Sequence, residues 1–561
     1  MSRLRQIFSL HGVLLAMIVI LIGVPVVTVL AHLFIPSSGV WPHLAATVLP
    51  GYVANSLWLM IGVGLGTLLV GTATAWLIVM TEFPGRKLLE WLLILPLAAP
   101  AYVIAYAYTD FLQVSGPVQS LLRDLTGWTA QDYGFPPIRS LGGAIFVFIF
   151  ALYPYVYLTA RAAFLQQCES AVEAARTLGC TNWSAFRRVA LPMARPALAA
   201  GVTLALMETL ADFGAVSYFG VQTFTTGIYR TWFSFGDRVA AAQLASLLLA
   251  FIAVLLLIER RSRRGARYDQ GRAQMRASAV TRLVGLRAML AQAVCALPVL
   301  FGFLLPTGIL LALLLTHEGG LSRGYGALIG NTVTLAAITA VLAVGLALAI
   351  VYALRLGGGL AVQATARLAA LGYAIPGSII AVGVLIPFAA FDSAMDNVMR
   401  ETFGVSTGLL LSGGIAAMVF AYLVRFLAVS QQTLQAGMDR ITPSMEAAAA
   451  TLGASRLRIL ARVHAPMLRG SLLTAALLVF VEVMKELPAT LIMRPFNFDT
   501  LAVRAHNLAA DERLAEAALP ALTIVLVGLV PVYILSRLIA ASRPTVKPAP
   551  DRPAGRTAAE A

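Results

Sequence analysis

Charged residues are scarce in this chain of 561 residues: they make up 12%, whereas about a quarter of the residues in a soluble protein are charged. Cysteine is also scarce, because the three present, Cys168, Cys180 and Cys295, suggest no pairing and show no metal-ligand spacing. The six histidines are scattered, and no nucleophile–base constellation is visible. These shortages argue against a soluble protein, a cysteine- or histidine-based metal site, and an enzyme.

Long apolar runs are abundant, since hydrophobic residues make up 59% of the chain. A helix needs about 20 such residues to cross a bilayer, and the candidate spans lie near 11–34, 55–80, 89–111, 141–163, 195–217, 238–258, 289–316, 328–354, 364–390, 406–429, 470–493 and 515–538. The runs are continuous and not alternating, which excludes a β-barrel. The first run is too long for a signal peptide, so we expect a retained span. The sequence predicts an all-α membrane protein with about twelve transmembrane helices.

Basic residues are distributed unevenly between alternate loops. If the N-terminus is cytoplasmic, the loops on that side hold 31 lysines and arginines, the opposite loops hold 9, and Lys485 lies within a span. The positive-inside rule then places both termini in the cytoplasm and explains the net charge of +15 without nucleic acid. We expect the basic linker 259–288 to anchor the topology near anionic membrane lipid. The tail 541–561, rich in proline and alanine, is expected to be disordered.

The second half of the chain repeats the first. With a shift of 274 residues, the stretch 177–179 (Thr-Leu-Gly) falls on the identical stretch 451–453, and Glu208 falls on Glu482. We therefore expect two transmembrane repeats, 1–258 and 289–540, of six spans each. Because six is an even number, both repeats have the same orientation, and a pseudo-twofold axis runs along the membrane normal.

A polar segment, residues 164–192, interrupts the apolar pattern on the cytoplasmic side of the fourth span. Its periodicity predicts two short helices that turn at Gly179, with Pro192 separating the second helix from the fifth span. Such a helix pair does not cross the membrane and is not hydrophilic enough to float freely in water. It needs a groove on a cytoplasmic partner or the headgroup layer of the membrane.

This segment resembles the EAA loop of permeases of ATP-binding-cassette (ABC) importers: Glu-Ala-Ala, three residues, Gly, nine residues, Ile, one residue, Leu-Pro. The matching residues here are Glu173, Ala174, Ala175, Gly179, Leu191 and Pro192, with Val189 in place of Ile. The second repeat offers Glu446, Ala448, Gly453 and Pro466. That copy departs further, because Ala447 stands at the Glu position and Ala465 at the Leu position. Glu446 is one residue early, which turns its carboxylate by about 100° around a helix.

The resemblance implies the type I ABC importer permease fold, with both transmembrane domains fused on one chain. It also implies that each EAA loop docks into a cytoplasmic ABC ATPase, so two ATPase copies are the expected partners. These partners, and not this chain, would use ATP and Mg. The sequence agrees, because none of the three lysines, Lys87, Lys485 and Lys547, follows a glycine as in a phosphate-binding loop. We expect no cofactor or metal bound by this chain and no enzymatic activity of its own.

Two further stretches, 208–245 and 485–522, resemble fused permeases of ferric-iron importers. The resemblance implies that a periplasmic binding protein delivers ferric iron for import across the bacterial inner membrane. Fused permeases of thiamine and phosphonate-type importers share this architecture, so these substrates stay open at this point.

Four carboxylates lie within the predicted fifth and eleventh spans: Glu208, Asp212, Glu482 and Glu486. Each pair is spaced i, i+4 and shares one helix face. Intramembrane carboxylates mark candidate functional sites, and hard cations prefer oxygen ligands. They either line a translocation pathway, or they pair with Lys485 and hold helix breaks at Gly214 and Pro488. Pro100 and Pro376, in the third and ninth spans, either shape the same pathway or kink packed helices.

An ion-coupled secondary transporter also has twelve spans in two parallel repeats. Transporters of the major facilitator type carry a basic loop between their second and third spans, but here that loop is only TEFPGRK. The duplicated polar loop instead follows the fourth and tenth spans. The sequence therefore favours the ATP-driven importer.

Overall fold

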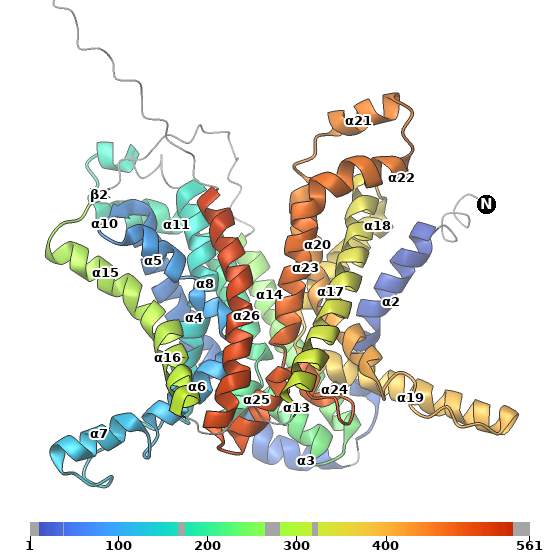
Figure 1. Cartoon of the computed structure of the whole chain (residues 1–561), viewed down its shortest axis with the longest axis horizontal. Helices are drawn as coiled ribbons and strands as arrows, with labels where there is room; N and C mark the ends of the chain where they lie inside the picture. Colours follow the sequence, from blue (N-terminus) through green and yellow to red (C-terminus); the bar gives the residue numbers. More distant parts are fainter. Residues whose placement is uncertain (1–9, 38, 167–173, 264–280, 317–323, 542–561) are drawn as a thin grey trace, which may run out of the picture.

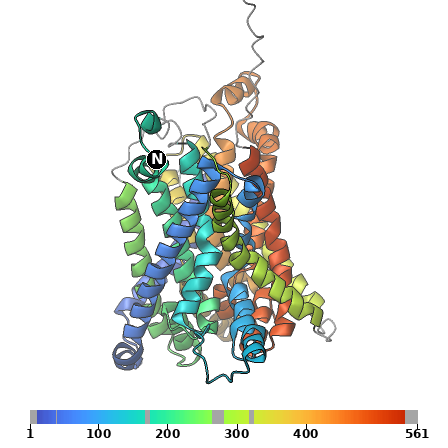
Figure 2. The ribbon, with the colours of Figure 1, turned by 90° about the vertical axis from the view of Figure 1, so that its left-hand side faces the viewer.

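The computed structural model in Figure 1 describes residues 10–37, 39–166, 174–263, 281–316 and 324–541. Within these ranges, eleven helices are long and apolar enough to cross a membrane, and one bent helix pair makes a twelfth candidate. Most of them run between the same two ends of the molecule (Figure 2). The predicted all-α architecture of about twelve spans is confirmed.

The helices follow the predicted order of spans. The first repeat contributes α2 (Leu10–Ala31), α4 (Leu49–Met80), α5 (Arg86–Leu92) with α6 (Ala101–Leu112) and α7 (Pro117–Thr126), α8 (Leu141–Gln166), α11 (Leu191–Ala211) and α14 (Arg238–Arg263). The second contributes α15 (Leu286–Val299) with α16 (Leu305–Thr316), α17 (Tyr325–Arg355), α18 (Leu360–Leu371), α19 (Gly377–Phe403), α20 (Ile415–Met438), α23 (Ala465–Met484) and α26 (Leu514–Ala541). Shorter helices lie near the lower end in Figure 1: α3 (Val40–His43), α13 (Phe224–Phe233), α24 (Pro488–Met493) and α25 (Leu501–Ala510).

Three spans of each repeat pack on one another in the same way. In the first repeat these are α4, α8 and α11, and in the second their counterparts α17, α20 and α23. Glycine permits the close approach of α11 to α8: a Cβ atom at Gly201 would lie 2.8 Å from the Cα atom of Val156. Packing over small residues is how membrane helices associate closely.

We expect Gly201→Val to destabilise the bundle by about 1–3 kcal/mol, because the new side chain collides with the backbone of α8. Gly64→Ala is the matched control on α4, since a Cβ atom there meets the Leu206 side chain at an ordinary 3.5 Å. The measurement is the midpoint of thermal unfolding in detergent. Equal midpoints for the two variants would contradict this packing.

The first span of each repeat packs on the other repeat. α2 contacts α18, α19 and α20 of the second repeat, whereas α15 and α16 contact α4, α5 and α6 of the first. In Figure 1, α2 lies beside α18, and α15 lies beside α5 on the opposite side. A parallel pair of short strands, β1 (Thr81–Glu82) and β2 (Thr281–Arg282), joins the first repeat to the end of the linker that leads into the second. The two repeats are therefore interlocked.

Two spans predicted as continuous helices are broken at proline. The third span turns at Pro100, where the helical axis changes direction by 94°. The ninth span is interrupted between α18 and α19, and Pro376 caps α19. Ala99 and Ile375, the residues before the prolines, are both extended with ψ 120°. Proline disfavours a helical conformation in the preceding residue, which explains both breaks.

The fifth and eleventh spans are broken at their outer ends. α11 ends at Ala211 and is followed by α12 (Gly214–Tyr218), whereas α23 ends at Met484 and is followed by α24. These are the helix breaks that the sequence offered as one of two interpretations.

The tenth span begins at Ile415 and not near 406 as predicted. The residues before it form a loop that α19 holds: the carboxylate of Asp392 accepts hydrogen bonds from the backbone N–H groups of Leu411 and Ser412, at 2.9 and 2.8 Å. This anchoring keeps an apolar segment out of the span.

Candidate functional site

The two segments that resemble the EAA loop, residues 173–192 and 446–466, are called the coupling loops below. Both contain the predicted turn between two helical segments. In the second loop, α21 (Pro443–Thr451) precedes α22 (Arg456–Ile459), and Gly453 between them has φ +78°. In the first, a helical turn at 174–177 precedes α10 (Asn182–Ala185), and Gly179 has φ +87°. Glycine is suited to such positive φ angles. Glu173 lies outside the described residues.

The expectation that Pro192 separates the second coupling helix from the fifth span is corrected. α10, a π-helical turn at 186–190 and α11 form one continuous helix, and Pro466 follows a similar turn at 460–464. Each proline falls in the first turn after the π-helical segment, where the wider hydrogen-bonding pattern accommodates the missing N–H group. Each coupling loop is thus joined without a break to a helix that carries one intramembrane carboxylate, Glu208 on α11 or Glu482 on α23, and the second carboxylate of each pair follows the end of that helix.

The tips of both coupling loops expose large apolar side chains. The equivalent residues Leu178 and Leu452 are 86% and 88% exposed, and Trp183 is 68% exposed. The other motif residues surround these tips: Ala174, Ala448, Pro192 and Pro466 are exposed, Leu191 is half-buried and Ala175 is buried. Exposed apolar groups at equivalent positions are suited to a docking surface.

The carboxylate of Glu446 turns back onto its own repeat. Its Oε1 accepts a hydrogen bond from Nε of Arg355 at 2.7 Å and lies 2.9 Å from Nε2 of His464. Arg355 also donates to the backbone carbonyl of Ile441 at 2.6 Å. The shifted glutamate of the second loop therefore fastens α21 to α17.

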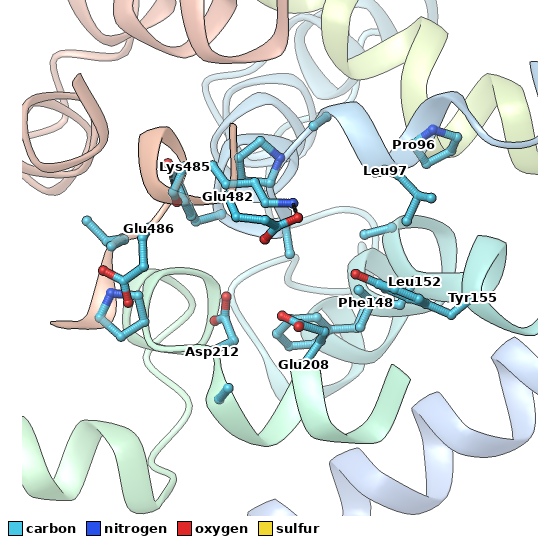
Figure 3. A pocket seen from close by; sticks show the side chains of 18 of the residues that line it. Pro96, Leu97, Phe148, Leu152, Tyr155, Glu208, Asp212, Glu482, Lys485 and Glu486 are labelled. Atoms are coloured by element: carbon cyan, nitrogen blue, oxygen red, sulfur yellow. Dashed lines mark hydrogen bonds and ion pairs between the residues drawn. The ribbon is translucent and has the colours of Figure 1, made fainter. Parts of the chain in front are cut away.

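A cavity of about 110 Å³ lies between the two repeats. Its lining includes all four predicted carboxylates and Pro100, together with Arg425 and Lys485. Figure 3 shows Glu208 and Asp212 projecting from the α11 segment, and Glu482, Lys485 and Glu486 from the α23 segment. Pro376 is not among the lining residues, but it stands directly before Gly377, where a Cβ atom would lie 2.4 Å from Oε1 of Glu486.

Two of the four carboxylates cap the short helices that follow the breaks in the fifth and eleventh spans. Asp212 Oδ1 accepts hydrogen bonds from the N–H groups of Ala215 and Val216, at 2.9 and 3.2 Å. Glu486 accepts from the N–H groups of Ala489 and Thr490, both at 3.0 Å. A negative charge is favourable at these unpaired N–H groups. The structure thus gives Asp212 and Glu486 a capping contact in addition to their place at the cavity.

The other two carboxylates are partly exposed toward the cavity. The side chains of Glu208 and Glu482 are 25% and 24% exposed. Glu208 accepts a hydrogen bond from the hydroxyl of Tyr373 at 2.8 Å, and Glu482 lies 2.8 Å from Nζ of Lys485. They occupy equivalent positions in the two repeats, and neither of them caps a helix, unlike Asp212 and Glu486.

Arg425 is a site residue that the sequence pattern did not reveal. The predicted boundaries 406–429 assigned it to the cytoplasmic end of its span, but α20 runs from Ile415 to Met438 and buries it to 8% exposure. Its guanidinium lies 3.3 Å from Glu486 and 3.8 Å from Glu208. A charge within a membrane helix is itself a signal of function, and correct boundaries would have uncovered it.

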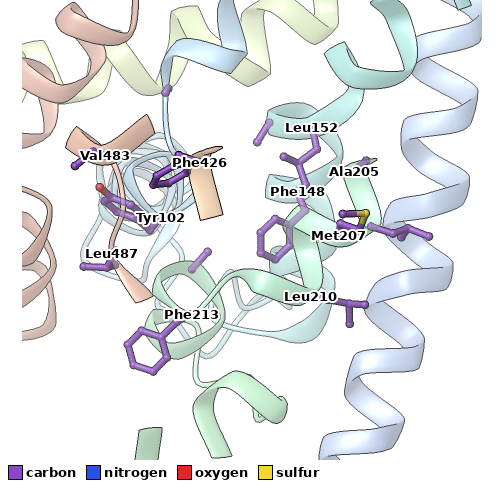
Figure 4. Packing of buried hydrophobic residues seen from close by; sticks show 14 of the residues in the cluster. Tyr102, Phe148, Leu152, Ala205, Met207, Leu210, Phe213, Phe426, Val483 and Leu487 are labelled. Atoms are coloured by element: carbon purple, nitrogen blue, oxygen red, sulfur yellow. The ribbon is translucent and has the colours of Figure 1, made fainter. Parts of the chain in front are cut away.

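Apolar side chains from both repeats pack around the cavity. Figure 4 shows Tyr102, Phe148, Phe213, Phe426 and Leu487 among them. Three of the broken spans, the third, fifth and eleventh, meet here, because a Cβ atom at Gly214 would lie 2.7 Å from both Leu487 and Tyr102. Within the described ranges, no three His, Cys, Asp or Glu side chains are grouped to hold a metal ion.

Known proteins are similar to this chain over different lengths of its sequence. Residues 67–268 match the family described as binding-protein-dependent transport system inner membrane component. The chain is 25% identical over 545 residues to the Fe(3+)-transport system permease protein FbpB 2 of Haemophilus influenzae, covering 93% of this chain and 98% of that protein. It is 33% identical over 210 residues to the sulfate transport system permease protein CysW of Escherichia coli, covering 37% and 68%.

A third relative, the molybdenum transport system permease protein ModB of Escherichia coli, is 29% identical over 208 residues, which are 36% of this chain and 88% of that protein. The shorter relatives correspond to part of this chain, whereas the first matches nearly all of it, as expected for a fused permease. The chain belongs to the family of binding-protein-dependent transport system inner membrane components, and it is the multi-pass inner membrane permease subunit of an ABC importer.

Proposed function

We propose that this chain moves ferric iron, delivered by a periplasmic binding protein, into the cytoplasm by ATP-driven alternating access. The similarity to an Fe(3+)-transport permease over 93% of the chain supports this substrate. The relatives named for sulfate and molybdenum align with 37% and 36% of the chain.

The charge of the cavity is the main observation in favour of a cationic substrate. Four carboxylates and two basic side chains line it, so four negative and two positive charges leave a formal charge of −2 when all are ionised. A cavity of this sign attracts a cation and repels a doubly charged oxyanion such as sulfate or molybdate. Oxygen ligands also suit a hard cation.

The two ends of the molecule suit two different kinds of partner protein. The coupling loops, the start of α2 and the end of α26 lie at one end (Figure 1), which the excess of basic residues assigns to the cytoplasm. Two copies of an ABC ATPase would dock on the exposed tips there and would bind ATP and Mg, while this chain binds neither. The periplasmic binding protein would dock at the opposite end.

Uptake by cells tests this function. A strain lacking this chain, with its ATPase and binding protein intact, would receive radiolabelled ferric iron, sulfate, molybdate or thiamine. We expect the restored chain to raise iron uptake alone, and deletion of the binding protein to abolish that gain. Restored uptake of sulfate, molybdate or thiamine in place of iron would contradict the proposed substrate.

A further inference from the structure

The basic residues of the cavity break the symmetry that its carboxylates obey. The shift of 274 residues relates Glu208 to Glu482, but it places Ala151 at the position of Arg425 and Ala211 at that of Lys485. Both alanines also line the cavity. The second repeat therefore supplies both cations of a site to which each repeat supplies two carboxylates.

Arg425 contacts carboxylates of both repeats. Its guanidinium lies 3.3 Å from Glu486 of its own repeat and 3.8 Å from Glu208 of the other. Lys485, by contrast, pairs within its own repeat, with Glu482 at 2.8 Å. Gly377 makes room for the arrangement, because a Cβ atom there would lie 2.4 Å from Oε1 of Glu486 and 3.0 Å from Nη1 of Arg425.

The contacts of Arg425 are longer than those of a firmly bound arginine. Arg355, for comparison, lies 2.7 Å from Glu446. The buried Nε–H group of Arg425 has no hydrogen-bond partner within the described part of the chain. A guanidinium has five N–H donors, so Arg425 has capacity to exchange one carboxylate for another. These features suit a contact that forms and breaks.

The helix that carries Glu208 gives this contact a mechanical consequence. α11 is continuous with the first coupling loop through the π-helical turn at 186–190. α20, which carries Arg425, packs on α23, the helix that continues from the second coupling loop. An ion pair between Arg425 and Glu208 therefore resists relative movement of the two loops, together with the hydrogen bond from the Tyr373 hydroxyl of the second repeat to Glu208.

We propose that Arg425 is a tethered counter-cation: it ties Glu208 of the first repeat to the second repeat in the resting permease and releases it during transport. This ion pair between Arg425 and Glu208, called the tie below, neutralises a carboxylate in the empty cavity. It also restrains closure of the ATPases in the absence of the binding protein. This inference rests on the proposed ATP-driven mechanism and is independent of which cargo is carried.

ATP hydrolysis by the complex in proteoliposomes, without binding protein, tests the tie. Arg425→Gln and Glu208→Gln should each raise this basal rate roughly fivefold, the factor that about 1 kcal/mol provides. The double variant should show no further rise, because both substitutions remove the same contact. Arg425→Lys, which keeps the charge but not the planar donors, should lie between the wild type and Arg425→Gln.

Arg161→Gln is the matched control. Arg161 is also a buried arginine, on α8, and it forms an ion pair with Glu90 of its own repeat. Its loss should leave the basal rate per folded complex within about a factor of two of the wild type, since it joins no two repeats. Folding is monitored by size-exclusion chromatography, and Arg425→Lys and Glu208→Gln still test the tie if Arg425→Gln fails to fold.

Three results would overturn the tie: an unchanged basal rate in folded Arg425→Gln, multiplying effects in the double variant, or an equal rise in Arg161→Gln. An absence of ATP hydrolysis in the wild-type complex would overturn the proposed function instead, and the tie with it.

Discussion

Gly179→Pro is expected to reduce ATP-driven uptake to the level measured without ATP, while the variant still inserts into the membrane. Gly179 has φ +87°, and proline fixes φ near −65°, so the turn between the two coupling segments cannot form. The segment after the turn is continuous with α11, and its displacement would detach the permease from the movement of its ATPase. The measurement compares uptake with ATP hydrolysis stimulated by the binding protein and its substrate.

Gly324→Pro is the matched control for this variant. Gly324 has φ +88° and caps α17, so it presents the same conformational strain in a loop assigned to the outer side. We expect this control to lower thermal stability but to keep the ratio of uptake to ATP hydrolysis. Normal substrate-stimulated hydrolysis in Gly179→Pro would contradict the docking of the coupling loop on an ATPase.

Glu208→Gln combined with Glu482→Gln is expected to lower iron uptake at least about tenfold, a change worth about 1.4 kcal/mol. These two carboxylates are partly exposed in the cavity and cap no helix. Their replacement by amides removes two negative charges from a cavity proposed to attract a cation, with little change in shape. The amide oxygens can still accept hydrogen bonds, so the thermal unfolding midpoint should fall by less than it does when a helix cap is lost.

Glu486→Ala separates this pathway effect from a structural one. Glu486 accepts hydrogen bonds from two N–H groups at the start of α24, and buried donors left without partners cost about 1–3 kcal/mol each. This variant should lose more stability than the double glutamine variant. Wild-type iron uptake by the double variant would show that the cavity is not the path of the cargo.

Hydrophobic runs and the internal repeat predicted most of the fold. Each of the twelve predicted spans has a counterpart, and the glycine turns of both coupling loops lie where the motif placed them. These features are local: the length of an apolar run and the φ angle of a glycine depend little on distant residues. That is why one sequence sufficed to place them.

The breaks within spans depended on contacts that a hydropathy profile does not contain. Pro100 and Pro376 were recognised as special, but proline both kinks and ends helices, and the turn of 94° depends on what packs around it. Pro192 shows the opposite case, because a π-helical turn keeps the helix continuous. The same residue type thus had different consequences in different packing environments.

The cross-repeat contacts were the least predictable part of the site. Arg425 meets Glu208, which is 217 residues away in the chain (425 minus 208), across an interface that forms only in the folded protein. A hydrophobic pattern also does not show that α2 and α15 each pack on the opposite repeat. The carboxylates could be singled out because charges are rare in membrane helices, but their division into helix caps and cavity-lining groups required the structure.

We propose above that this chain, with its ATPases and binding protein, imports ferric iron and that ATP hydrolysis drives the import. The most direct measurement is uptake by proteoliposomes that hold the complex, with ATP inside, iron-loaded binding protein outside, and labelled sulfate and thiamine tested in parallel. We predict accumulation of iron that requires both ATP and the binding protein, and none of the other two. Uptake driven by an ion gradient without ATP, or accumulation of sulfate or thiamine in place of iron, would contradict the claim.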